Sequence, residues 1–245
     1  MSRRFAAALV VGSACMLVAC NSAPTGIVYR HSSPSTASCT TRVTRDCSGY
    51  TYATPSPGTV VVTAPKSSGA NNREFFWGLR GRGEADLTVC ATFSSGDGID
   101  QQGIALRLNA TASGGTTGIT VTRNIWMDAF NVFNFHVWNT AADPSTPFTQ
   151  FGSKVIRGLP VRRPVYPLRM CARAVSTTDE VEFVVWTSGQ KEPTWGSTTQ
   201  GGEARIPAGA PSSGRGGWFA GHLTPGTSMT YRDLTVDGMV AKGLP

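Results

Sequence analysis

The sequence predicts an all-β protein, built as a two-sheet antiparallel β-sandwich. Apolar and polar residues alternate with a period of two in short segments, which is typical of strands with one buried face. Glycine-containing turns, at 96–98, 114–115 and 201–202 among others, separate these segments at intervals of about 8–12 residues. No segment of helix length carries a 3.6-residue period, and no internal repeat is present. Many short strands joined by such turns favour a sandwich or jelly roll.

The alternation places the strands between residues 59 and 236. In chain order they span residues 59–63, 74–79, 86–93, 103–109, 118–123, 130–139, 166–175, 181–187, 217–223 and 228–236. Hydrophobic residues make up 40% of the chain and charged residues 15%, so a sizeable core can form. We therefore predict one β-sandwich domain over residues 58–245.

The first 19 residues predict a signal peptide. Arg3 and Arg4 precede an apolar run that is shorter than the about 20 residues of a membrane-spanning helix. The run ends in Leu17-Val18-Ala19-Cys20, which resembles the lipobox of bacterial lipoproteins. This resemblance implies that Cys20 becomes the mature N-terminus and carries a diacylglycerol, which anchors the protein to the extracytoplasmic face of the cell membrane. The alternative is an ordinary secretory signal that ends in cysteine.

Residues 20–57 are rich in Ser, Thr and Pro and poor in large apolar residues. Such a composition buries little surface, so we expect a disordered tether that lifts the domain off the membrane.

Four cysteines remain after Cys15 is removed with the signal and Cys20 is acylated, and an exported protein favours disulfides between them. Cys90 and Cys171 both lie on the polar parity of their predicted strands, so they can pair if these strands are neighbours. Cys39 and Cys47 would then close a small loop in the tether. The alternative is free or reshuffled thiols.

The chain is basic, with 22 Lys+Arg against 15 Asp+Glu. Loss of Arg3 and Arg4 with the signal leaves 20 against 15, a formal charge of +5. For an exported protein this excess favours anionic headgroups or acidic wall polymers as partners over nucleic acid. A solvated basic surface without a partner explains the same excess.

Several segments resemble the concanavalin A-like, laminin-G-like jelly rolls. The similar segments are 84–93, 166–171, 181–186, 217–222 and 229–236, and together the resemblance covers about residues 70–240. It implies the fold rather than a function, because that fold hosts lectins, glycosidases and adhesion modules.

One face of the predicted sheet carries side chains suited to sugar recognition. Indole rings stack on the apolar faces of sugar rings, while amides, imidazoles and guanidinium groups hydrogen-bond to hydroxyls. The candidate ligand-binding residues are Trp126, Asn134, His136, Trp138 and Arg107. The alternative is that both indoles belong to the core and that His136 is structural.

Catalytic and metal sites are weakly indicated. Jelly-roll glucanases carry a Glu-x-Asp-x-x-Glu string. Here Glu84 and Asp86 match its first two acidic residues, but Val89 occupies the position of the second Glu. Glu180 and Glu182 lie on the same face of a predicted strand, and their spacing is near that of the two carboxyl groups of a retaining glycosidase. The alternative is that Glu180 belongs to a hairpin turn, where acidic residues are common. With three histidines in the chain we expect no multi-histidine metal site, and we assign no cofactor.

The sequence therefore predicts a membrane-anchored, exported lipoprotein that binds a glycan or another cell-envelope component without transforming it. Two alternatives stay open. One is a divergent glycoside hydrolase or lyase of the jelly-roll type, and the other is a structural envelope module that binds protein.

Overall fold

The computed structural model describes residues 27–32, 50–64, 66, 73–78, 83–94, 101–111, 115–124, 131–140, 142, 147–159 and 166–240. These residues form two antiparallel sheets and include no helix, which confirms the predicted all-β sandwich. A helix long and apolar enough to cross a membrane is accordingly not found among the described residues.

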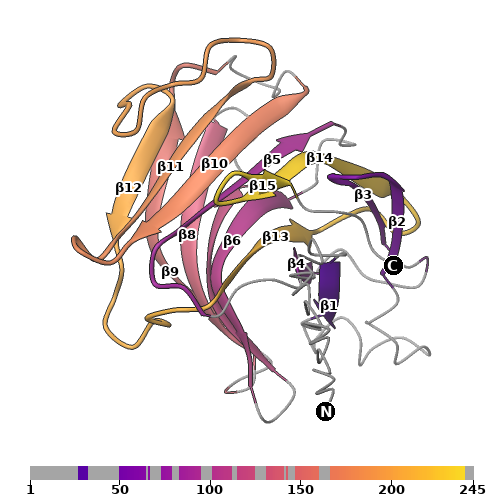
Figure 1. Ribbon diagram of the computed structural model, residues 1–245, viewed down its shortest axis with the longest axis horizontal. Helices are drawn as coiled ribbons and strands as arrows, with labels where there is room; N and C mark the ends of the chain where they lie inside the picture. Colours follow the sequence, from indigo (N-terminus) through magenta and orange to yellow (C-terminus); the bar gives the residue numbers. More distant parts are fainter. Residues whose placement is uncertain are drawn as a thin grey trace, which may run out of the picture.

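One sheet, called here the seven-stranded sheet, runs in the order β1-β4-β13-β6-β7-β8-β9 (Figure 1). Its strands are β1 (Ile27–Ser32), β4 (Arg73–Gly78), β13 (Arg215–Gly221), β6 (Gln101–Ala110), β7 (Thr116–Arg123), β8 (Asn131–Asn139) and β9 (Phe148–Ile156). β6 to β9 form a meander of consecutive hairpins, whereas β13 inserts between β4 and β6 from much later in the chain.

The eight-stranded sheet runs in the order β12-β11-β10-β5-β14-β3-β2, with a short β15 beside β14. Its strands are β12 (Gly201–Arg205), β11 (Glu180–Thr187), β10 (Leu168–Val175), β5 (Leu87–Phe93), β14 (Ser228–Val236), β3 (Thr59–Thr63), β2 (Thr51–Ser56) and β15 (Met239–Val240).

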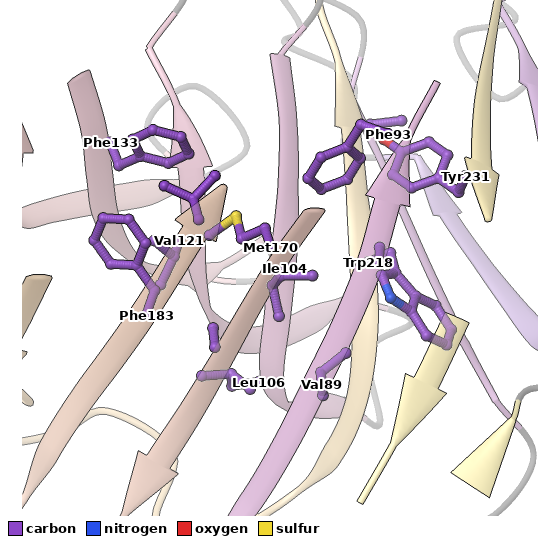
Figure 2. Close-up of a cluster of buried hydrophobic side chains, with 14 of the residues drawn as sticks. Val89, Phe93, Ile104, Leu106, Val121, Phe133, Met170, Phe183, Trp218 and Tyr231 are labelled. Atoms are coloured by element: carbon purple, nitrogen blue, oxygen red, sulfur yellow. The ribbon is translucent and has the colours of Figure 1, made fainter. Parts of the chain in front are cut away.

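The core lies between the two sheets and is made by the inward-facing parity of each strand. Figure 2 shows side chains of both sheets meeting there, among them Phe133 of β8 and Phe183 of β11, whose ring centroids are 5.0 Å apart. Two of the large rings also pair their polar atoms: Trp218 Nε1 donates to the carbonyl of Cys90, at 3.1 Å, and Tyr231 Oη donates to the carbonyl of Phe219, at 2.6 Å. Alternation therefore predicted the core correctly for these strands.

Every predicted strand is present, and residues 59–63 and 228–236 match β3 and β14 in full. Alternation missed β9 because a bulge opposite Phe135 and His136 shifts its register. The prediction of a turn at 201–202 is wrong, because these glycines open β12. A side chain at Gly201 would lie 2.5 Å from the Phe183 carbonyl oxygen, so glycine permits the strand to pair there.

The sandwich begins earlier in the chain than predicted. β2 pairs with β3, Tyr50 is 1% exposed within the core, and β1 pairs with β4. The prediction that residues 20–57 form a disordered tether is therefore wrong for these segments. The segment is poor in large apolar residues on average, but Tyr50 buries its large ring against the core and so contributes apolar area. Cys20, Cys39 and Cys47 lie outside the described residues.

The predicted Cys90–Cys171 disulfide is confirmed. The two cysteines are directly opposite each other on β5 and β10, on the outer face of the eight-stranded sheet. Trp186 and the half-buried Trp195 pack over the bridge. Parity placed both cysteines on the same face, and the pairing of β5 with β10 meets the condition of neighbouring strands on which the prediction depended.

Candidate functional site

Three of the predicted site residues share the outer face of the seven-stranded sheet. Asn134, His136 and Trp138 alternate along β8 and point away from the core, as their parity predicts. They are 6%, 4% and 2% exposed, however, so the prediction of a solvated binding surface at these residues is wrong. Trp126 lies outside the described residues.

Trp138 is buried by aromatic rings from other strands of the same sheet. Its ring centroid lies 4.8 Å from that of Phe148, 5.0 Å from that of Phe75 and 5.5 Å from that of Phe219. Its Nε1 donates a hydrogen bond of 2.8 Å to Thr120 Oγ1. A ring held by three neighbours and by its own polar atom is not a free stacking platform, so Trp138 is a structural residue.

Small residues in the middle of the sheet make room for these rings. Ala105 of β6 belongs to the same cluster, and Gly118 of β7 pairs directly with Trp138. A side chain at Gly118 would lie 2.5 Å from the Leu108 side chain. Rings from the flanking strands therefore close over the middle of the sheet and form a second apolar layer outside it.

His136 belongs to this closed layer. Burial, and to a smaller extent the nearby Arg73 guanidinium, lowers the pKa of His136 to about 4. Arg73 itself lies 5.2 Å from the ring centroid of Phe148 and 5.9 Å from that of Trp138. His136 is therefore neutral at physiological pH, and the face carries a cation and an imidazole within an aromatic cluster.

The structure separates Arg107 from the other predicted site residues. β6 carries a bulge at this point, where Arg107 has a φ of 51° and the pairing with β7 shifts between Leu106 and Asn109. The bulge turns Leu108 to the outer face, whereas strict alternation from Ile104 and Leu106 would place it in the core. Arg107 consequently leaves the sheet face and contributes to one end of the sandwich.

The bulge is held by contacts on both sides. Asn109 Nδ2 donates to the carbonyls of Arg107, at 3.0 Å, and Ser213, at 2.7 Å. Gly214 packs so closely that a Cβ there would lie 2.3 Å from the Arg107 carbonyl carbon. A non-glycine residue in the left-handed region costs about 1–3 kcal/mol and persists only where the surrounding structure enforces it.

Arg107 lines a pocket of about 740 Å³, called here the end pocket. Its walls come from the β10–β11 turn, from Ala85 before β5, and from the loop between β12 and β13. This loop lies at the lower left in Figure 1. The lining residues are Ala85, Arg107, Ser176, Asp179, Arg205, Ile206, Pro207, Ala208, Gly209, Ala210 and Ser212. This volume lies within the range of small-ligand sites, about 300–1,000 Å³.

The described lining of the end pocket carries more positive than negative side chains. Arg107 and Arg205 line it, whereas Asp179 is its one lining carboxylate among the described residues. The nearby Asp86 accepts hydrogen bonds from the Ser176 amide, at 2.5 Å, and from the Ser176 hydroxyl, at 2.9 Å. These bonds lower the pKa of Asp86, with a smaller contribution from Arg107. Asp86 is therefore ionised, and both of its carboxylate oxygens accept hydrogen bonds from Ser176.

The described residues do not place a catalytic carboxylate pair in this pocket. Glu182 lies on the outer face of the eight-stranded sheet, where Arg173 binds it through Nη2 at 2.9 Å and Nε at 3.2 Å. Glycosidases use two carboxyl groups flanking the scissile bond, and the described lining supplies Asp179 alone. No group of three metal-ligating side chains occurs in the part of the chain that the structure describes.

Among the residues that line the end pocket, the sequence singled out Arg107 as a candidate and none of the others. The Arg107 guanidinium contacts the carbonyl of Pro211, 104 residues further along the chain, and no local pattern encodes such a contact. Asp179 occupies the β10–β11 turn with a φ of 54°, and an acidic residue in a hairpin turn is no signal of a ligand site. The one local signal is Arg205 before the Pro-, Ala- and Gly-rich segment 206–212.

No protein family model matches this chain, and no curated protein matches it either. Similar solved structures include the carbohydrate binding module CBM66 from Bacillus subtilis, with 10% identity, a TM-score of 0.45 and coverage of 76% of this chain and 99% of that one. A protein of unknown function with a galectin-like fold from Bacillus subtilis has 13% identity and a TM-score of 0.49, covering 89% and 98%. A legume lectin-like domain from Entamoeba histolytica has 9% identity and a TM-score of 0.49, covering 76% and 88%. Likeness of this degree concerns the fold and carries no argument about the ligand.

Proposed function

We propose that this protein is a lipoprotein anchored to the extracytoplasmic face of the cell membrane, and that its β-sandwich binds an envelope glycan in the end pocket without transforming it. The observation that supports this proposal most is the pocket itself, where segments from four parts of the chain converge on a volume suited to a small ligand.

The lining of the end pocket suits a sugar unit. The hydroxyls of Ser176 and Ser212 and the carboxylate of Asp179 can accept hydrogen bonds from sugar hydroxyls, and the arginines can donate them. Ile206 and Pro207 add an apolar patch that fits the C–H surface of a sugar ring. The single lining carboxylate among the described residues favours binding over hydrolysis.

Binding is tested with the full chain in detergent against a panel of envelope polysaccharides, by isothermal titration. Ala208→Trp places a large ring at the exposed loop of the end pocket, and Ala142→Trp adds the same ring at an exposed turn outside it. We expect at least one polysaccharide to bind the wild type, with affinity lost in Ala208→Trp and kept in Ala142→Trp. Equal binding by both variants would exclude the end pocket, and no binding by the wild type would favour the protein-binding alternative.

The same titrations decide between binding and catalysis. We expect the polysaccharide to be recovered with an unchanged number of reducing ends after prolonged incubation. Release of reducing ends by the wild type would instead support the hydrolase alternative.

Anchoring is tested separately, through the cysteine of the lipobox. Metabolic labelling of growing cells with an alkyne fatty acid is expected to label the wild type and to leave Cys20→Ser unlabelled. An unlabelled wild type would reject the lipid anchor and favour an ordinary secretory signal.

A further inference from the structure

The Arg107 guanidinium in the end pocket is only partly satisfied by the protein. Its Nε donates to the carbonyl of Ala85, at 2.9 Å, and its Nη1 to the carbonyl of Pro211, at 3.2 Å. The residue is 3% exposed, and its Nη2 is buried with no hydrogen-bond partner among the described residues. A buried donor without an acceptor costs about 1–3 kcal/mol, and more when the group is charged.

No described carboxylate forms an ion pair with Arg107. Among the described residues the one ion pair is Arg173–Glu182, on the other side of the eight-stranded sheet. Asp86 is occupied by Ser176, and it and Asp179 attract Arg107 only from a distance. Burial lowers the pKa of Arg107, but a guanidinium remains charged in proteins. A buried cation of this kind is stabilised by an anion.

The local backbone is arranged to keep Arg107 in this place. Arg107 occupies the left-handed region within a bulge, which Asn109 and Gly214 hold from both sides. Strained backbone and bulges cluster at sites where a side chain must be aimed at a ligand. The strain and the unpaired donor thus occur at the same residue, which lines the one pocket described above.

We propose that the end pocket binds the acidic group of an anionic glycan, with Arg107 Nη2 donating to a carboxylate or phosphate oxygen and Arg205 making a second contact at the exposed rim. The planar guanidinium matches the geometry of both oxyanions. The proposal rests on the glycan-binding function above and specifies the class of sugar. The charge of the described lining, two arginines against one carboxylate, fits an anionic ligand.

The test compares three ligands by isothermal titration into the full chain in detergent. They are a six-residue oligouronate, the same oligosaccharide after reduction of its carboxylates to primary alcohols, and a glycerol phosphate oligomer. We expect at least one of the two acidic ligands to bind more tightly than the neutral one, by a factor of about ten or more. The affinity of that acidic ligand should fall as the sodium chloride concentration is raised. The oligouronate and the phosphate oligomer distinguish the two sources of the oxyanion.

Variants locate the contact. Arg205→Gln changes an exposed residue and is expected to weaken the acidic ligand about ten-fold while leaving the melting temperature unchanged. Arg107→Gln is expected to weaken it at least as much, but this variant also loses the bonds to Ala85 and Pro211. The matched control is Arg232→Gln, an exposed arginine of β14 outside the pocket, which is expected to bind like the wild type.

The outcomes separate the two proposals. If the neutral oligosaccharide binds as tightly as the acidic ligands, glycan binding stands and its anionic specificity is rejected. If none of the three ligands binds although an envelope polysaccharide does, the anionic proposal is also rejected. An equal loss in Arg232→Gln and Arg205→Gln would show attraction to the general surface charge and would overturn the assignment to the end pocket.

Discussion

Substitution of Trp138 by alanine distinguishes most clearly between a structural and a ligand-binding role for the outer face of the seven-stranded sheet. The ring is 2% exposed and lies within 5.5 Å, centroid to centroid, of three other aromatic rings. We therefore expect Trp138→Ala to destabilise the fold strongly, whereas loss of an exposed stacking ring would leave stability nearly unchanged.

The magnitude follows from the ring and from its hydrogen bond. Truncation of a buried tryptophan costs about 3–5 kcal/mol, because surface burial is lost and a cavity is left. Part of this loss is that Thr120 Oγ1 no longer accepts the 2.8 Å bond from Nε1. With a loss of about 4 kcal/mol and about 2–4 °C per kcal/mol for a domain of this size, the melting temperature should fall by about 8–16 °C.

The assay is thermal unfolding followed by circular dichroism, with Trp195→Ala as the matched control. Trp195 is half-buried, packs on the Cys90–Cys171 bridge and lies under the Arg173 guanidinium at 4.4 Å. Its truncation should cost about 1–2 kcal/mol, which is ordinary for a partly exposed side chain. If Trp138→Ala lowers the melting temperature no more than Trp195→Ala, the structural role assigned to Trp138 is wrong.

Three further predictions concern other parts of the fold. The pKa of His136 is about 4 in the folded state and ordinarily 6.5, so neutral His136 contributes fully to the free energy of unfolding above pH 6.5 and loses this contribution as the pH falls to 4. In urea titrations the free energy of unfolding should fall by about 3 kcal/mol over this range, and this fall should be absent in His136→Gln. Joint replacement of Cys90 and Cys171 by serine should cost about 2–5 kcal/mol, and dithiothreitol should lower the melting temperature of the wild type but not of this variant. Gly214→Ala forces a Cβ against the Arg107 backbone, so it should destabilise the fold by about 1–3 kcal/mol and weaken binding of the acidic ligand; wild-type affinity in this variant would refute the link between the bulge and the pocket.

Alternation along the chain predicted ten of the strands, most of their faces and one disulfide. Where a strand is regular, as in β5, the residues at every second position all point to the core. It could not predict the burial of the outer face, because this depends on which strands become neighbours. Phe75 and Phe219 both contact Trp138, yet they are far apart in the sequence.

The end pocket was only partly predictable, for two physical reasons. A bulge with a non-glycine residue in the left-handed region has no local signature, so the reversal of parity after Arg107 could not be foreseen. The pocket walls are also assembled from turns and loops, where neither composition nor period encodes tertiary contacts. What the sequence could indicate was a basic chain with an arginine suited to ligand binding.

In the end pocket, Arg107 is expected to bind the acidic group of an envelope glycan. A crystal structure of the protein with the six-residue oligouronate would show this contact. We expect a carboxylate oxygen at about 2.7–3.2 Å from Arg107 Nη2. An oligosaccharide bound instead on the outer face of the seven-stranded sheet, beside Asn134 and His136, would contradict it.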